Sequence, residues 1–365
     1  MDIKFDFNDI VIPPSETFTN INSRKFCNIY DDVFNNIPIF TAPMFDVVSL
    51  KNYQIFMDNN INPIIPRSKL NLSNFSEFIK HSSKMFVSVS LREFEDYILS
   101  DSYFDEFNKS NYIKFHVLID IANGHMKKIY DLCSIAKIKY SDKIILMVGN
   151  IANPNIISNI YRENCVDYIR LGIGNGNACT TTQNVGVGYP MASLIYESYN
   201  ILNKIDSVRY KRPKLIADGG MKSTSDIIKS LYLGADYVMV GSMFNKCLES
   251  SSNTSYIKNG TSQIIDQYSD ESKLLFESGE SIYKIYRGMS TKNIQSEIKN
   301  DNTKLTTSEG VIIKNIKVEY IISGWVENFS DYLKSTMSYV NSDNLMSFKG
   351  KPIFITNNAY TRFNK

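Results

Sequence analysis

The chain has 365 residues, of which 43% are hydrophobic and 21% charged, and its net charge is +2. This is the composition of an ordinary soluble globular protein. So small a net charge gives no indication of a nucleic-acid partner or a membrane partner. No apolar run approaches the roughly 20 residues that span a bilayer. The N-terminus, MDIKFDFNDI, is unlike a signal or transit peptide, so we expect a cytoplasmic protein.

The cysteines are few, scattered and odd in number, with no CxxC pair. They are Cys27, Cys133, Cys165, Cys179 and Cys247. This spacing favours free thiols in a reducing compartment and argues against a zinc site or a disulfide framework.

Apolar runs recur along the chain after an N-terminal arm, residues 1–36, with helical stretches between them. Most runs are continuous rather than alternating, as expected of strands that are covered on both faces of a parallel sheet. We expect strands at residues 37–42, 62–66, 85–89, 114–120, 144–149, 168–172, 214–218 and 237–241. Repeated strand–helix units of this number predict an α/β fold, a (β/α)₈ TIM barrel in a single domain, residues 1–365. A doubly wound open sheet is the alternative.

Helix signals stand between and after these runs. Asn153-Pro154 predicts one helix start, and the capping residues from Ser223 to Asp226 predict another. A last barrel helix is expected at residues 326–340, where apolar side chains recur four apart.

Residues 250–315 are expected to form an excursion and an active-site flap after the eighth strand. Residues 250–273 are polar, which predicts a mobile surface excursion. Residues 281–287, SIYKIYR, alternate like a hairpin strand.

Glycine and polar residues gather where these strands end, and barrel active sites lie at that face. The sixth strand leads into GIGNGNACTTT, in which Cys179 stands among glycines. A thiol in such a loop is partly exposed among backbone dipoles, as reactive cysteines are. A glycine-rich turn with an incidental cysteine is the alternative. Asp218-Gly219-Gly220 and Gly241-Ser242 end the next two strands, each before a helix, which predicts a phosphate cradle.

Longer motifs then follow one another in order. They are APM at Ala42, DIANG at Asp120, GN at Gly149, GIGNGNACTT at Gly172, IADGG at Ile216, VMVGS at Val238, YRGMS at Tyr286 and SEG at Ser308. In content and order, over most of the chain, they resemble the inosine-5′-monophosphate dehydrogenase and guanosine-5′-monophosphate reductase superfamily.

Finer features resemble the reductase branch. They are KFDFNDIVI at Lys4 followed by Asn22-Ser23-Arg24, CTT followed by GVGYP, the serine after Gly288-Met289, and STMSYV at Ser335. Between the second and third strands there is no room for the tandem regulatory (CBS) domain of most dehydrogenases. The chain departs from reductases at Pro66-Arg67-Ser68, at Asn177, and at Thr306, where an arginine is expected. A dehydrogenase without its regulatory domain and a catalytically silent purine-nucleotide-binding barrel are the alternatives.

The resemblance implies an oxidoreductase of purine salvage that converts GMP to IMP with NADPH and releases ammonia. It implies Cys179 as nucleophile, with Thr181 and Glu309 as a proton-carrying dyad. Substrate contacts are implied for Asp218, Gly219, Gly220, Gly241, Ser242, Gly288, Met289, Ser290, Thr306, Ser308 and Gly310.

Cofactor contacts are implied for Ser23, Arg24, Arg67, Asp120, Asn150, Ile173 and Gly174. In relatives, the first two reach the dinucleotide from a neighbouring subunit. The resemblance also implies a homotetramer. The resemblance also implies a monovalent cation, K⁺, held by backbone carbonyls at Gly174, Gly176 and Cys179.

Overall fold

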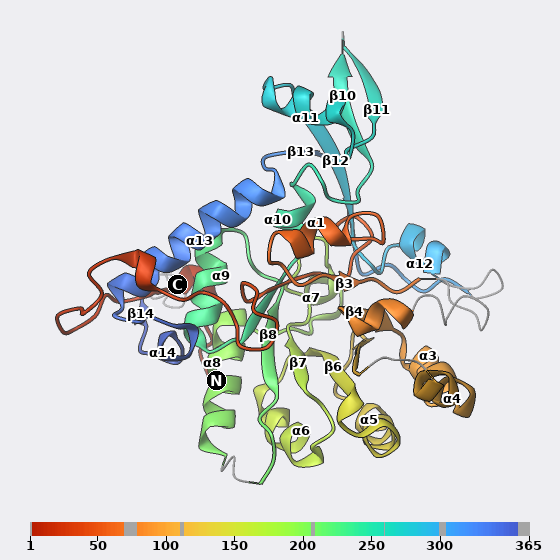
Figure 1. The fold of residues 1–365 in the computed structure, drawn as a ribbon, viewed down its shortest axis with the longest axis vertical. Helices are drawn as coiled ribbons and strands as arrows, with labels where there is room; N and C mark the ends of the chain where they lie inside the picture. The colour runs from red at the N-terminus through yellow and green to blue at the C-terminus, as the bar shows by residue number, and fades with distance from the viewer. Residues whose placement is uncertain are drawn as a thin grey trace.

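The computed structural model describes residues 2–68, 79–109, 113–205, 209–258, 260–298 and 304–356. Its centre is an eight-stranded parallel sheet in the order β2-β9-β8-β7-β6-β5-β4-β3. The strands are β2 (Ile39–Thr41), β3 (Ile64–Ile65), β4 (Phe86–Val89), β5 (Phe115–Asp120), β6 (Ile144–Ile151), β7 (Tyr168–Leu171), β8 (Lys214–Asp218) and β9 (Tyr237–Val240). A parallel bridge between Phe40 and Asn62 joins the two ends of the sheet. The predicted TIM barrel is therefore confirmed, with a strand in each expected run, and the doubly wound alternative is wrong (Figure 1).

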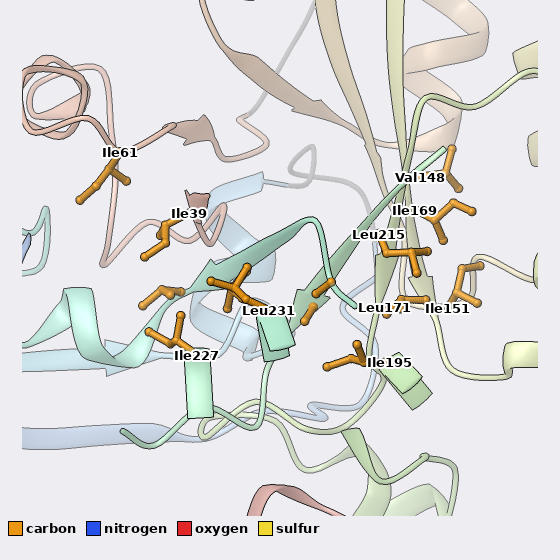
Figure 2. Close-up of a cluster of buried hydrophobic side chains, with 14 of the residues drawn as sticks. Ile39, Ile61, Val148, Ile151, Ile169, Leu171, Ile195, Leu215, Ile227 and Leu231 are labelled. Atoms are coloured by element: carbon orange, nitrogen blue, oxygen red, sulfur yellow. The ribbon is translucent and has the colours of Figure 1, made fainter. Parts of the chain in front are cut away.

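Helices cover the outside of the barrel (Figure 1). The longer ones are α4 (Asp101–Lys109), α5 (Lys127–Tyr140), α6 (Ile157–Glu163), α8 (Met191–Lys204), α9 (Thr224–Leu233) and α13 (Ile322–Tyr339). Figure 2 shows part of the apolar layer beneath them, where Leu171 and Leu215 from the strands lie near Ile195 of α8. The last helix begins at Ile322, before the expected start at residue 326. No helix in the described part of the chain is long and apolar enough to cross a membrane.

The predicted capping signals are present. Ser223 Oγ accepts from the backbone N–H of Asp226, and the Asp226 carboxylate accepts from the N–H of Ser223. This reciprocal pair satisfies two free amides at the start of α9. Asn153 accepts from the N–H of Asn155, at the short 3₁₀ turn Pro154–Ile156 that precedes α6.

The barrel interior is filled mainly by aromatic rings. Phe40 packs edge-on against Phe86, with ring centroids 5.7 Å apart, and Phe86 packs against Tyr168 at 5.3 Å. The other buried residues of this cluster are Ala42, Ile64, Leu118, Met147, Ile216, Tyr237 and Met239. The interior below the C-terminal mouth is a packed core, so the barrel offers space for a ligand only at the mouth.

A second, antiparallel sheet projects from the barrel at the top of Figure 1. Its order is β11 (Thr261–Ile265), β10 (Thr254–Lys258), β12 (Ile282–Arg287), β13 (Ile312–Lys317), and α11 (Asp270–Glu277) lies beside it. The alternating strand at 281–287 is confirmed, with every second residue buried.

The excursion predicted at 250–273 contains regular structure, since β10 and β11 fall within it and α11 begins at Asp270. Ser250, Ser252 and Thr254 are buried, and Ser252 Oγ donates to the carbonyl of Ile285. The polar residues at the start of the segment are therefore used for internal hydrogen bonds, whereas those of β11 are mostly exposed. Residues 259 and 299–303 of the predicted excursion lie outside the described part of the chain, and the assignment of residues 1–365 to one domain stays a prediction.

The described residues also form smaller strands and helices. They are the strands β1 (Ile10–Val11) and β14 (Phe354–Ile355), which pair antiparallel, and the short helices α1 (Tyr53–Asp58), α3 (Leu91–Glu93), α7 (Thr181–Val185), α10 (Ser242–Asn245), α12 (Lys292–Ile298) and α14 (Leu345–Phe348).

Candidate active site

A cavity of about 290 Å³ lies at the C-terminal mouth of the barrel. Most residues singled out by sequence line it: Arg67, Asp120, Asn150, Ile173, Gly174, Gly176, Cys179, Thr181, Asp218, Gly219, Gly220, Gly241, Ser242, Gly288, Met289, Ser290 and Glu309. They come from strand ends and loops far apart in the sequence.

A chain of hydrogen bonds runs from the thiol in this cavity to a carboxylate. Cys179 Sγ donates to Thr181 Oγ1 at 3.2 Å, and Thr181 Oγ1 donates to Glu309 Oε2 at 2.7 Å. The three groups thus form a continuous path along which a proton can pass. Cys179 is also the one cysteine of the five that is not buried. Burial raises the pKa of the Cys133 and Cys247 thiols well above the usual value, which leaves them inert.

Backbone pairing holds Glu309 beside the cysteine loop. The N–H of Thr180 donates to the carbonyl of Glu309 at 2.8 Å, and the N–H of Val311 donates to the carbonyl of Ala178 at 3.0 Å. Gly288 must be glycine for this approach, because a Cβ there would lie 2.6 Å from the Ala178 oxygen. Glu309 is therefore positioned by main-chain contacts on both sides.

The twin-glycine turn after β8 lies against the same loop. Gly219 and Gly220 have φ of +87° and +83°, and a Cβ on Gly219 would lie 3.0 Å from the amide nitrogen of Gly176. Ser242, at the start of α10, accepts a hydrogen bond from Asn177 Nδ2 at 2.9 Å. Because the two glycines line the cavity without side chains, their backbone is accessible to a phosphate there.

Tyr286 lines this side of the cavity and was not singled out by sequence reasoning. It is buried, and a Cβ on Gly241 would lie 2.7 Å from its hydroxyl oxygen. The alternation of residues 281–287 could have indicated this residue, because it puts every second side chain, including that of Tyr286, on the buried face.

A network of charged side chains crosses the cavity at the strand ends. Arg170 Nη1 donates to Asp120 Oδ1 at 2.7 Å, and Arg170 Nε donates to Asp218 Oδ2 at 2.9 Å. Asn150 Nδ2 donates to the same Asp218 oxygen at 2.9 Å, and Arg67 Nε lies 3.2 Å from Asp120 Oδ2. Burial alone would lower the pKa of Arg170, but the two carboxylates hold it above its ordinary value.

Arg170 is another cavity residue that sequence reasoning missed. The sequence does contain an indication of this residue, because Arg170 is a charge inside the buried strand YIRL. A charged side chain in such a strand needs a partner of opposite charge.

Several predicted residues do not reach the cavity. Thr306, Ser308 and Gly310 lie beside it: Gly310 pairs with Cys179, and Thr306 is held by the side chain of Gln295. Ser23 and Arg24 lie on the outside, where Arg24 Nη2 is 3.7 Å from Asp331 Oδ2 of α13. Their implied contact with a dinucleotide in a neighbouring subunit stays a prediction.

The cysteine loop has features that fit a monovalent cation. Gly174 has a φ of +80°, and the Gly176 carbonyl accepts from the N–H of Cys179 at 2.9 Å, so the chain turns tightly here. Asn175 Oδ1 is buried in the same loop without a hydrogen-bond partner. An orphaned oxygen beside a curled backbone is compatible with a cation held by oxygen ligands.

Comparison with known proteins agrees with this geometry. The model of the family described as "IMP dehydrogenase / GMP reductase domain" matches residues 113–362. A GMP reductase from Lactobacillus delbrueckii subsp. bulgaricus is 30% identical over 333 residues, covering 87% of this chain and 94% of the relative. A GMP reductase from Buchnera aphidicola subsp. Acyrthosiphon pisum is 26% identical over 97% of this chain and 94% of its own. GMP reductase 1 of Homo sapiens is 24% identical over 97% and 95%. The chain therefore belongs to the IMP dehydrogenase / GMP reductase family.

Proposed function

We propose that this protein is a GMP reductase, an oxidoreductase of purine salvage that uses NADPH to convert GMP to IMP and ammonia. The observation that carries the proposal is the path from Cys179 through Thr181 to Glu309 in the barrel-mouth cavity, beside the twin-glycine turn. Its relatives of 24–30% identity are GMP reductases by name.

The nucleotide would lie with its phosphate at Gly219, Gly220, Gly241 and Ser242, where open backbone and a helix start meet. Asp218 would accept hydrogen bonds from the ribose hydroxyls. The segment Gly288-Met289-Ser290 would line the purine, with Thr306, Ser308 and Gly310 supporting the flap behind it. In this placement, C2 of the base would face Cys179.

The exocyclic amine on C2 is a poor leaving group. A covalent intermediate with the enzyme replaces one difficult step by two easier ones. The Cys179 sulfur forms a bond to C2, and the C2–N bond breaks as the amine departs as ammonia. When bound, NADPH supplies a hydride to C2. The C–S bond then breaks, its electron pair returns to sulfur, and IMP is released.

Thr181 and Glu309 move the protons that this sequence needs. Passing the thiol proton along the two hydrogen bonds generates the reactive thiolate and a protonated Glu309. Glu309 then returns the proton, through Thr181, to the departing nitrogen. A positioned relay of this kind contributes about 10²- to 10⁴-fold in rate.

The dinucleotide would occupy the side of the cavity where Arg67 and Asp120 lie. Arg67, Asp120, Asn150, Ile173 and Gly174 line that side and offer both charges and an amide. K⁺ at the carbonyls of Gly174, Gly176 and Cys179 would stiffen the cysteine loop. A homotetramer, with Ser23 and Arg24 reaching a neighbour's dinucleotide, and a cytoplasmic location belong to the same proposal.

The test is the absorbance of NADPH in a mixture of the pure protein and GMP. We expect GMP-dependent loss of absorbance, and no loss in Cys179→Ala, whose IMP affinity should stay within about tenfold. Appearance of NADH from IMP and NAD, with no oxidation of NADPH by GMP, would instead identify a dehydrogenase. Binding of GMP without either reaction would identify a silent nucleotide-binding barrel.

A further inference from the structure

Arg170 sits between the two halves of the cavity. The phosphate-cradle side is built by β8 and β9, and the other side by β3 and β5. Arg170, on β7 and 9% exposed, bonds to the end of β8 through Nε and to the end of β5 through Nη1, at 2.9 and 2.7 Å. Arg67 continues the network at Asp120, and Asn150 continues it at Asp218.

We propose that Arg170 is a positioning residue that couples nucleotide binding to dinucleotide binding, so that each ligand increases the affinity for the other. The proposal rests on the proposed function, in which Asp218 holds the ribose of the nucleotide and Asp120 faces the dinucleotide. Arg170 is placed to act through these two carboxylates.

The strand pattern explains why the side chain reaches both. Tyr168 belongs to the barrel interior, and successive strand residues alternate faces, so Arg170 lies on the same face one level nearer the mouth. The neighbouring strand makes room with Gly149, because a Cβ there would lie 2.4 Å from Arg170 Cβ. Asp120 and Asp218 occupy corresponding inward positions at the ends of β5 and β8.

The shape of the guanidinium explains how one site can influence the other. Its donors are fixed in a plane, so orienting the group toward Asp218 also orients it toward Asp120. A nucleotide that fixes Asp218 therefore orders the carboxylate on the dinucleotide side before the second ligand arrives. The conformational entropy of the two carboxylates is then lost only once, when the first ligand binds. The second ligand binds more tightly for that reason, which gives positive coupling. Coupling between sites typically changes affinity about 5- to 150-fold, and the effect is reciprocal.

The experiment uses IMP and NADPH, a pair between which no hydride transfer is possible. Titration calorimetry gives the affinity for IMP with and without saturating NADPH, and the affinity for NADPH with and without IMP. In the wild type we expect each ligand to tighten the other by the same factor, at least about fivefold. In Arg170→Met we expect that factor to fall to near one.

A purely structural role would weaken binding of both ligands and leave the coupling factor unchanged. Arg170→Lys keeps the positive charge but replaces the planar fork with a single ammonium, so its factor should lie between those of wild type and Arg170→Met. It also carries the test if Arg170→Met fails to fold. The matched control is Lys128→Met, which removes an exposed ion pair with Glu95 on the barrel exterior and should keep the full factor.

The outcomes separate the two proposals. A wild-type coupling factor of one, or a full factor in a folded Arg170 variant, overturns the inference even if GMP is reduced. Coupled binding of IMP and NADPH that depends on Arg170, without turnover of GMP, overturns the proposed reaction and supports the coupling.

Discussion

The Thr181 hydroxyl is the middle member of the proton path, and substitution can isolate it. Thr181→Val keeps the side-chain shape but removes the group that accepts from Cys179 Sγ and donates to Glu309 Oε2. We expect kcat to fall about 10²- to 10⁴-fold with little change in the affinity for IMP. Stopped-flow measurement of NADPH oxidation gives kcat, and calorimetry gives the affinity.

Thr181→Ser is the matched control, since serine restores the hydroxyl and should recover most of the rate. A Thr181→Val enzyme with the wild-type kcat would mean that Glu309 exchanges protons by another route.

Lys284 is a buried charge outside the cavity, and it gives stability a pH dependence. It lies on β12, 1% exposed, and its Nζ donates to the carbonyl of Ser250 at 3.0 Å and to Thr254 Oγ1 at 2.9 Å. Burial lowers its pKa to about 7, against the opposing influence of Cys247, Glu249 and Asp46. Above pH 7 the folded protein therefore releases a proton that the unfolded chain retains until its ordinary pKa of 10.5.

Because the unfolded state binds more protons in this range, stability rises with pH. The free energy of unfolding should increase by about 1 to 3 kcal/mol between pH 7 and pH 9 through this group. Urea unfolding at several pH values should show the rise in wild type and in Lys258→Met, whose residue is exposed, but not in Lys284→Met. An unchanged pH slope in Lys284→Met would mean that the buried amine does not titrate there.

Individual residues differ in whether they could be identified from the sequence. Cys179, Gly219 and Gly220 were identifiable because their chemistry is read from local motifs. Arg170 and Lys284 were not, because their roles depend on partners that only the closed fold brings together.

At the scale of elements, the side chain of Gln295 joins α12 to the flap segment. Gln295 Nε2 donates to the carbonyls of Ser290 and Thr306, at 2.8 and 3.2 Å. Its Oε1 accepts from the N–H and hydroxyl of Thr306, at 2.8 and 3.0 Å. The carboxamide thus ties the cavity residue Ser290 to the segment that leads to Glu309.

Gln295→Leu removes this tie while keeping similar bulk. We expect kcat to fall at least about tenfold, since a misplacement of about 1 Å in a catalytic group can cost about 100-fold. Steady-state kinetics would measure the loss. Ser296→Ala, on an exposed position of the same helix, should leave kcat unchanged. Equal rates in the two variants would mean that backbone pairing alone holds Glu309.

The antiparallel sheet shows the limit of reading elements from polarity. β12 was predictable because it alternates between buried and partly exposed residues. β10 and β11 were not, because an edge hairpin with a polar face has no apolar period, and its pairing with β12 spans the chain between residues 254 and 284. A local hydrophobic pattern identifies strands that bury one face. Strands such as β10 and β11, which lack such a pattern, form because of tertiary pairing.

At the scale of the whole molecule, the barrel was predictable because each strand–helix unit carries its own apolar run. Where the barrel closes was less apparent, since β2 and β3 are the shortest strands of the sheet. A single bridge joins them, and polar side chains extend it: Thr41 Oγ1 accepts from the N–H of Ile64 at 2.9 Å.

Asn62 is the main side chain of this closure and the best place to test it. It is 5% exposed, its Nδ2 donates to the carbonyls of Ile37 and Ile39, and its Oδ1 accepts from Asn36 Nδ2 at 2.8 Å.

Asn62→Leu leaves these groups without their partner, which should lower the free energy of unfolding by about 1 to 3 kcal/mol. Urea unfolding measures the change, and Gln54→Leu, an exposed glutamine on α1, should stay within about 0.5 kcal/mol of wild type. Because Asn62 does not line the cavity, kcat of the folded variant should match the wild type. A variant as stable as wild type would mean that backbone hydrogen bonds and the aromatic interior suffice to close the barrel.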